Sequence, residues 1–452
     1  MFKSEWSLTK AIAIGAFCGL ILFFIFLYIW KTGLGKTVRH EIAIKKCQIA
    51  LIFNSRDAKA YYNWGLLLSR IGKYEEAIEK YKKALELNPK LAEAYSSWGE
   101  NLSDLGKHLE AVEKYSKAIE INPKLSRVYI NWGVSLHSLG RYEEAIEKYQ
   151  KAVELGDYDD LAYYNWGLVL GELRRYPEEI EKYKQAVQIN PKYANAYSNW
   201  GSALADLGRY EEAVEQYKKT VEISPRDAVT YYNWGSVLVD MRVYSDAIEK
   251  FKKAVDFNPK YAEAYTSLGW TLDRVNKQDE AIENFQIAVK LNPKNYKAYT
   301  GWGWVLGKKK EKINEALEKF NKAIEINPKS AEVYYYYGES LILSGRYAQA
   351  IEKYRQLVEI KPNSAVAYYR WGIALNNLRS YRNAIDKFQK ATEIDSNFAD
   401  AYSEWAFALK QMGWFQEAES RSKKARELYE KQEIKQNTQT LSDLLGGLEP
   451  KR

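Results

Sequence analysis

Asparagine recurs in this chain at a spacing that suits the binding of an extended peptide. Five asparagines lie at multiples of 34 residues from one another: Asn63, Asn131, Asn165, Asn199 and Asn233. A side-chain amide offers an acceptor oxygen and two N–H donors, so a row of amides matches the alternating C=O and N–H groups of an extended backbone. The alternative is that these asparagines are merely solvated, and recur because the local Tyr-Asn-Trp sequence was duplicated.

Aromatic and basic residues share the same register. Tyr62, Tyr164 and Tyr232 each precede one of the asparagines, and a tyrosine ring there suits stacking or apolar anchoring. Arg370 stands further along the chain at the asparagine position itself. We therefore predict a peptide-binding site made of Asn63, Asn131, Asn165, Asn199, Asn233, Tyr62, Tyr164, Tyr232 and Arg370.

Residues for catalysis or metal binding are scarce. The chain has three histidines and two cysteines, and none has a partner at a metal-ligand or redox spacing. No glycine-rich phosphate loop and no nucleophile with a neighbouring base is present. We expect no enzymatic activity, no cofactor and no metal.

A repeat of 34 residues positions these side chains. Its first copy, 58–91, reads AKAYYNWGLLLSRIGKYEEAIEKYKKALELNPKL, and the frame restarts at Ala92, Ser126, Asp160, Ala194, Ala228, Ala262, Tyr296, Ala331, Ala365 and Ala399. Apolar residues at positions 4, 7, 8 and 11 of the repeat make a stripe on one helix, and those at 20, 24 and 27 do so on a second. Asn-Pro near position 31 stops the second helix.

This pattern resembles the tetratricopeptide-repeat (TPR) family. The resemblance covers residues 58 to about 430 and implies an all-α TPR α-solenoid, a right-handed superhelix of helix hairpins. It also implies a concave groove lined by first-helix positions 2, 5, 6, 9, 12 and 13, which holds an extended peptide or a partner helix. The asparagine row at position 6 is similar to the asparagine ladder of the O-linked N-acetylglucosamine transferase TPR domain. It stops at Gly301, Tyr336, Arg370 and Glu404.

Residues 11–30 are twenty positions without a charge, long enough to cross a bilayer as one helix. The apolar run is longer than that of a signal peptide and ends in Tyr-Ile-Trp, so we predict an uncleaved transmembrane helix in contact with membrane lipid. Two basic residues precede it and five follow within sixteen residues, which predicts a cytoplasmic solenoid. Gly15 and Gly19 have the spacing of a helix-dimer motif, although chance spacing in a segment with several glycines is the simpler account.

The predicted organisation is then a flank at 1–10, the transmembrane helix at 11–30, a basic segment with a half-repeat at 31–57, eleven repeats with a cap at 58–430, and a disordered tail at 431–452. The net charge is +8, and the first 57 residues hold eight basic against three acidic groups; the array that follows is near neutral, which argues against nucleic-acid binding. Two departures from the pattern stand out. Glu179 replaces the small residue at position 20, and we expect it to widen a helix crossing or to tilt its unit, because the carboxylate must reach water. The tryptophans at position 7 are expected to pack in the core.

These features favour a membrane-tethered scaffold that binds peptide segments or partner proteins in the groove. One alternative is a structural element whose solenoids self-associate into a membrane lattice, as a homo-oligomer. A second is a protein-targeting receptor. The sequence itself names no partner.

Overall fold

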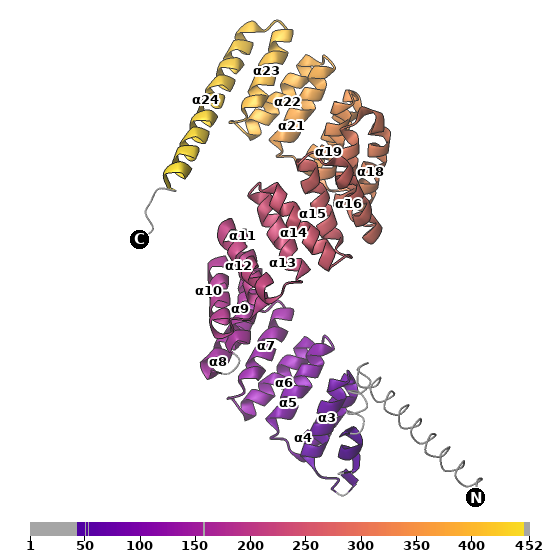
Figure 1. Ribbon diagram of the computed structural model, residues 1–452, viewed down its shortest axis with the longest axis vertical. Helices are drawn as coiled ribbons and strands as arrows, with labels where there is room; N and C mark the ends of the chain where they lie inside the picture. The colour runs from indigo at the N-terminus through magenta and orange to yellow at the C-terminus, as the bar shows by residue number, and fades with distance from the viewer. Residues whose placement is uncertain (1–42, 50, 53, 157–158, 447–452) are drawn as a thin grey trace, which may run out of the picture. The chain divides into compact units, whose positions relative to one another are not determined.

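The computed structural model describes residues 43–49, 51–52, 54–156 and 159–446, with side chains up to residue 433. The regular elements in this part of the chain are helices, and no strand occurs among them. The described helices follow one another as antiparallel pairs (Figure 1). By compactness the chain divides into two units, 1–223 and 224–452. The predicted transmembrane segment at 11–30 lies outside the described residues.

The first unit contains five complete helix pairs among the residues that the structure describes. Its first helices are α3 (Ala58–Arg70), α5 (Ala92–Asp104), α7 (Ser126–Ser138), α9 (Asp159–Glu172) and α11 (Ala194–Asp206). Its second helices are α4 (Tyr74–Leu87), α6 (His108–Ile121), α8 (Tyr142–Leu155), α10 (Tyr176–Ile189) and α12 (Tyr210–Ile223). Residues 43–49 and 51–52, ahead of α3, are also helical, and Ile44 packs against the cluster around Leu68 and Tyr81.

The second unit contains six pairs. Its first helices are α13 (Ala228–Asp240), α15 (Ala262–Arg274), α17 (Tyr296–Gly307), α19 (Ala331–Leu343), α21 (Ala365–Asn377) and α23 (Ala399–Gln411). Its second helices are α14 (Tyr244–Phe257), α16 (Gln278–Leu291), α18 (Ile313–Ile326), α20 (Tyr347–Ile360), α22 (Tyr381–Ile394) and α24 (Phe415–Gly446). The extra residue of the eighth repeat is taken up by a 3-10 turn, η1 (Lys310–Lys312).

The last helix ends later than the predicted array boundary near 430. α24 continues to Gly446, through residues that we expected to be a disordered tail. Between Lys431 and Gly446 the sequence contains neither proline nor an internal glycine, so no local signal stops the helix earlier.

Asparagine helps to end most of the other second helices. The Asn88 side-chain oxygen accepts a hydrogen bond from the Lys90 backbone N–H at 3.1 Å, which folds the chain into a turn immediately after α4. The same bond recurs at Asn122, Asn190, Asn258, Asn292 and Asn327. The Asn-Pro pair thus stops the helix and also starts the turn that leads to the next first helix.

In the first ten repeats, the two helices of a pair cross where a glycine faces an aromatic ring. A Cβ atom added to Gly133 would lie 2.6 Å from the Tyr149 ring, and one added to Gly167 would lie 2.5 Å from Tyr183. The rings at this position, number 24 of the repeat, are the largest fully buried side chains of the structure. In the eleventh repeat the ring is replaced by Ser422, and the glycine is replaced by Ala406. The alanine methyl group therefore occurs where no ring needs the space.

The tryptophans at position 7 pack against the hydrophobic clusters of the core, as we predicted. Of this set only Trp405 is buried, and the others are half-buried with a cation over the ring. The Lys148 ammonium lies 4.4 Å from the Trp132 ring centroid, and the same pair recurs at Trp64–Lys80, Trp98–Lys114, Trp166–Lys182, Trp234–Lys250, Trp302–Lys319, Trp371–Lys387 and Trp405–Arg421. Each of these eight tryptophans thus joins its first helix to a basic residue of the second helix of the same repeat.

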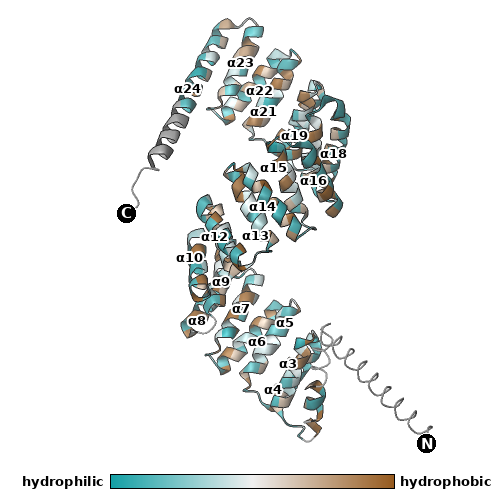
Figure 2. Cartoon of the chain, viewed as in Figure 1, coloured by the Kyte–Doolittle hydropathy of each residue, from teal (hydrophilic) through white to brown (hydrophobic). Residues whose placement is uncertain are grey.

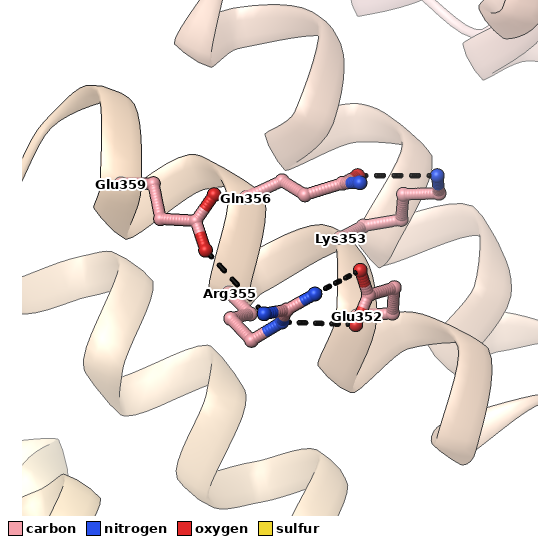
Figure 3. A network of polar contacts seen from close by, with 5 residues as sticks. All are labelled: Glu352, Lys353, Arg355, Gln356 and Glu359. Carbon is pink, nitrogen blue, oxygen red and sulfur yellow. Dashed lines mark hydrogen bonds and ion pairs between the residues drawn. The ribbon is translucent and has the colours of Figure 1, made fainter.

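Hydrophilic and hydrophobic residues alternate around the helices (Figure 2). The exposed faces of the second helices carry short-range ion pairs. On α20, Arg355 lies between Glu352 at 2.7 Å and Glu359 at 3.5 Å (Figure 3). Such exposed pairs contribute little to stability, typically about 0–1 kcal/mol each, and mark a solvated surface. No helix in the described part of the chain combines the length and apolar character needed to cross a membrane.

Candidate peptide-binding site

The first helices line pockets in both units. We call the surface formed by positions 2, 5, 6, 9, 12 and 13 of these helices the first-helix surface. In the first unit, one pocket of about 560 Å³ lies between α3, α5 and the start of α7, and one of about 470 Å³ lies between α9, α10 and α11. In the second unit, pockets of about 430 and 510 Å³ lie along α13, α15, α17, α19 and α21. Residues at these six positions make up most of each lining.

Three of the predicted asparagines stand on successive first helices of the first unit, and each uses at least one amide N–H internally. The Asn131 Nδ2 donates to Glu100 Oε1 at 2.8 Å, on the preceding first helix. The Asn199 Nδ2 donates to the Tyr164 hydroxyl at 3.3 Å in the same way. The Asn165 Nδ2 donates to the Leu161 carbonyl oxygen, 2.8 Å away in its own helix. Asn131 and Asn165 each keep a second amide N–H and the acceptor oxygen for a partner, whereas Asn199 also hydrogen-bonds to Tyr183 and keeps its acceptor oxygen.

The other two predicted asparagines lie apart from this row. Asn63 is exposed on α3, and the next repeat carries Ser97 at the equivalent position, so no amide links it to Asn131. Asn233 belongs to α13 of the second unit, where it is half-buried and already takes part in an interaction. The structure thus places Asn131, Asn165 and Asn199 together, and separates Asn63 from them by one repeat.

The predicted tyrosines are half-buried and contact other aromatic rings. The Tyr164 ring centroid lies 4.8 Å from Tyr193 and 5.9 Å from Tyr183. Tyr232 lies 5.1 Å from Tyr261 in the equivalent arrangement. Tyr62 has the ring of Tyr81 at 5.9 Å. One part of each ring is therefore fixed by packing, and the remainder faces a pocket in the case of Tyr62 and Tyr232.

Arg370 is half-buried and paired. Its Nε lies 3.4 Å from Glu339 Oε1, and the Tyr354 hydroxyl donates to the same carboxylate oxygen at 2.5 Å. Burial and the neighbouring Glu339 carboxylate raise the pKa of Tyr354. A partner carboxylate would have to compete with Glu339 for this guanidinium.

A cluster of aromatic residues in the second unit was missed at the sequence level. Trp270 and Trp304 occupy position 9 of two successive repeats, and Tyr336 lies 5.0 and 5.1 Å from their rings. The Trp304 indole N–H donates to Asp273 at 3.2 Å, and Lys308 pairs with the same carboxylate at 2.6 Å. The signal was available, because tryptophan occurs at this groove position in no other repeat. These rings offer flat apolar faces to a partner.

Glu179 corrects our prediction for the fourth repeat. Its side chain is 7% exposed, so the carboxylate does not reach water as expected. It occupies the space left by Gly171 on α9, since a Cβ atom there would lie 2.9 Å from Glu179 Oε1. The helix crossing is not widened at its centre, because Gly167 faces Tyr183 as closely as the matching pairs do elsewhere. A glycine one turn away, which sequence reasoning overlooked, makes room for the acid.

The Glu179 carboxyl is consequently hard to ionise. Its pKa is raised to about 7, chiefly by burial; the hydrogen bond with Tyr183 lowers the pKa and the Asp206 carboxylate raises it. Its Oε2 atom is buried without a hydrogen-bond partner. The 470 Å³ pocket that contains it is lined by Leu168, Gly171, Glu172, Arg174, Tyr176, Glu179, Tyr183, Asn199, Ser202, Ala203 and Asp206.

The first-helix surface carries polar and aromatic groups of the kinds that bind peptides. It supplies amide donors and acceptors, aromatic faces and a few buried charges, which are the groups that fix an extended peptide. Among the described residues, no group of three or more His, Cys, Asp or Glu side chains is arranged to hold a metal ion.

Sequence models of the tetratricopeptide repeat match this chain at residues 58–91, 92–125, 250–283 and 309–370, and a TPR-repeat model matches 133–173, 175–208 and 201–241. No curated protein matches the chain.

Three solved structures are similar to parts of it. YrrB, described as a TPR protein with an unusual peptide-binding site, is 27% identical, covers 41% of this chain and 96% of its own, and has a TM-score of 0.36. MamA is 28% identical, covers 36% and 96%, and has a TM-score of 0.34. Yeast Tom70 is 18% identical, covers 86% and 95%, and has a TM-score of 0.43.

Proposed function

Because this chain belongs to the tetratricopeptide-repeat family, we propose that it is a protein-interaction scaffold that binds an extended peptide segment of a partner on its first-helix surface. Proteins of this fold family are generally non-catalytic, so the proposal is binding and not a reaction. The observation that carries it is the row of Asn131, Asn165 and Asn199, each with unused hydrogen-bonding capacity, beside pockets on the same surface.

The internal bonds of these amides support a binding role. The Asn131 and Asn199 side chains are each held by a residue of the preceding repeat, which fixes where their remaining hydrogen-bonding groups point. A donor that is held in place before binding loses less side-chain entropy when the partner arrives. A freely rotating surface asparagine would not have this advantage.

Membrane tethering is the second part of the proposal. The uncharged segment 11–30 would hold the scaffold at a membrane, with the repeats on the cytoplasmic side where the basic residues after it are retained. A partner captured there is confined to the membrane surface, which raises its local concentration.

The binding proposal can be tested with peptides selected from a random dodecapeptide library against the full-length chain. Replacing Asn131, Asn165 and Asn199 together by Ala should weaken the selected peptides at least tenfold in fluorescence anisotropy, since each lost hydrogen bond is typically worth about 0.5–1.5 kcal/mol.

The matched control replaces Glu147, Glu181 and Glu215 by Ala. These glutamates are exposed on the second helices of the same three repeats, so peptide affinity should stay unchanged. Circular dichroism should show the same helix content in both triple variants. Equal affinity for the two variants would rule out the asparagine row as the binding site.

A further inference from the structure

Three carboxylates meet in the pocket of the fourth repeat. Glu172 at the end of α9 and Asp206 at the end of α11 are exposed at its rim, and Glu179 on α10 is buried within it. Within the described part of the chain, none of the three forms an ion pair. The only basic side chain in the lining is Arg174, which is exposed in the turn between α9 and α10. The lining therefore has an excess of acidic groups.

The buried acid distinguishes this pocket from an ordinary acidic surface. Glu179 is more than nine-tenths buried, lines the pocket, and has an oxygen with no hydrogen-bond donor. A buried acceptor without a partner is costly, and the cost disappears when a ligand supplies the donor. A cationic donor also compensates the charge of the ionised carboxylate, which a neutral donor does not.

The position of the pocket indicates where that donor comes from. Asn199, a member of the proposed asparagine row, lines the same pocket, and Asn165 precedes it on α9. A peptide backbone held by these amides would pass the pocket mouth, within reach of a long side chain. Lysine and arginine combine a flexible apolar stem with a terminal cation, and the stem can pack against Leu168 and Ala203.

We propose that the pocket formed by Glu172, Glu179 and Asp206 binds the cationic end of a lysine or arginine side chain of the peptide held on the first-helix surface. This inference rests on the proposed function and adds a specificity: the partner segment carries a basic residue opposite the fourth repeat. Glu179 is the residue that selects charge, and the two rim carboxylates attract the cation to it.

Binding of this kind is linked to pH. The groups that face Glu179 are Glu172 and Arg174 on the α9 side, Tyr176 and Tyr183 on α10, and Asp206 on α11. With a carboxyl pKa of about 7, most Glu179 side chains are protonated at pH 6 and most are ionised at pH 8. A cation binds the ionised form, so affinity for a basic peptide should increase by up to roughly tenfold between these pH values.

The test uses the peptides selected from the dodecapeptide library at pH 8. Each lysine is replaced by acetyl-lysine and each arginine by citrulline, which keep the shape and remove the charge. With the unaltered full-length chain, one of these replacements should weaken binding about tenfold at pH 8 and less at pH 6. With Glu179→Gln most of the preference for the charged peptide should be lost, because only the exposed rim carboxylates remain, and the pH dependence should disappear.

Glu181→Gln is the control, because it removes an acid from the exposed face of the same helix, outside the pocket. Asp206→Asn should partly reduce the preference of the chain for the charged peptide. Because Asp206 is exposed at the pocket rim, this substitution does not alter a buried position. Urea unfolding of all variants establishes that they are folded.

The outcomes separate this inference from the proposed function. If the triple asparagine variant weakens binding while charge removal from the peptide has no effect, the scaffold function stands and the basic-residue pocket is wrong. Retention of the charge preference by Glu179→Gln would also overturn it. If no peptide binds the unaltered chain, both proposals fail.

Discussion

Glu179 and Gly171 illustrate how two residues of one repeat depend on each other. The acid takes the place of the small residue found elsewhere at position 20, and it fits because Gly171 has no Cβ atom to occupy the same space. An alanine at Gly171 would bring a methyl group within 2.9 Å of the carboxylate oxygen. Burying the Glu179 carboxyl in this way lowers the stability of the fold, and it places an acid in the lining of a pocket.

Because the Glu179 carboxyl is buried, the free energy of unfolding should depend on pH. In the folded chain the Glu179 carboxyl loses its proton near its raised pKa of about 7, whereas in the unfolded chain it loses the proton near 4.5, the ordinary pKa of a glutamate. The free energy of unfolding therefore falls as pH rises from 4.5 through 7, by up to about 3 kcal/mol. Glu179→Gln removes this loss, so the variant should be more stable than the unaltered chain at pH 8.5 and nearly equal to it at pH 4.5.

Urea unfolding at several pH values measures the difference. Glu181→Gln serves as the reference, since that side chain is exposed on the same helix. If the two variants differ from the unaltered chain by the same amount at every pH, the Glu179 carboxyl is not ionised at a cost in the folded state.

At the scale of helices, the tryptophan–lysine pairs join the two helices of a repeat. The basic residue at position 23 is present in each repeat with tryptophan at position 7 except the fifth, where Trp200 faces Gln216. In the seventh repeat, the tryptophan is replaced by Leu268 and the lysine by Asn284. The two positions thus change together there, as expected if the cation is present for the ring.

The fifth repeat allows the pair to be tested by adding it. Gln216→Lys should place an ammonium over the Trp200 ring and raise the free energy of unfolding by about 0.5–1 kcal/mol. The nearby Lys184, 5.8 Å from the same ring, is not an obstacle, because Trp98 has both Lys82 and Lys114 in the equivalent places.

Gln216→Met is the control, since it has similar length and no charge. A gain of the same size for the methionine and lysine variants would mean that the stem packs on the ring and the charge adds nothing. The comparison is made by urea unfolding at neutral pH.

At the scale of the whole molecule, the proposed membrane tether would determine where the first-helix surface meets its partner. A helix of about twenty apolar residues is held in a bilayer far more strongly than a peripheral contact. We expect the full-length chain to stay with membranes after a carbonate wash and to require detergent for release. Deletion of residues 1–31 should move the chain to the supernatant while leaving its helix content unchanged.

A deletion of residues 434–452 at the other end is the matched control, because it shortens the chain without touching the apolar segment. This variant should remain with the membrane. Release of the full-length chain by carbonate alone would contradict the predicted anchor.

The sequence by itself determined the repeat and therefore the helices. The local signals are the 34-residue period, the glycine at position 8, the aromatic residue at position 24 and Asn-Pro at the end of the repeat. Local backbone and packing preferences of this kind suffice to place helices such as α3 and α4. The sequence also pointed to the asparagine register, because the same residue recurred at the repeat period. Neither signal requires knowledge of which residues distant in the chain meet.

Only the tertiary structure decided what these side chains contact. That Asn131 bonds to Glu100, that Glu179 fits against Gly171, and that the position 7 tryptophans lie beneath lysines depends on neighbours supplied by another helix. The burial of Glu179 shows the reason. A carboxylate is expected to seek water, and whether it can stay inside depends on the space that a glycine on a different helix leaves open.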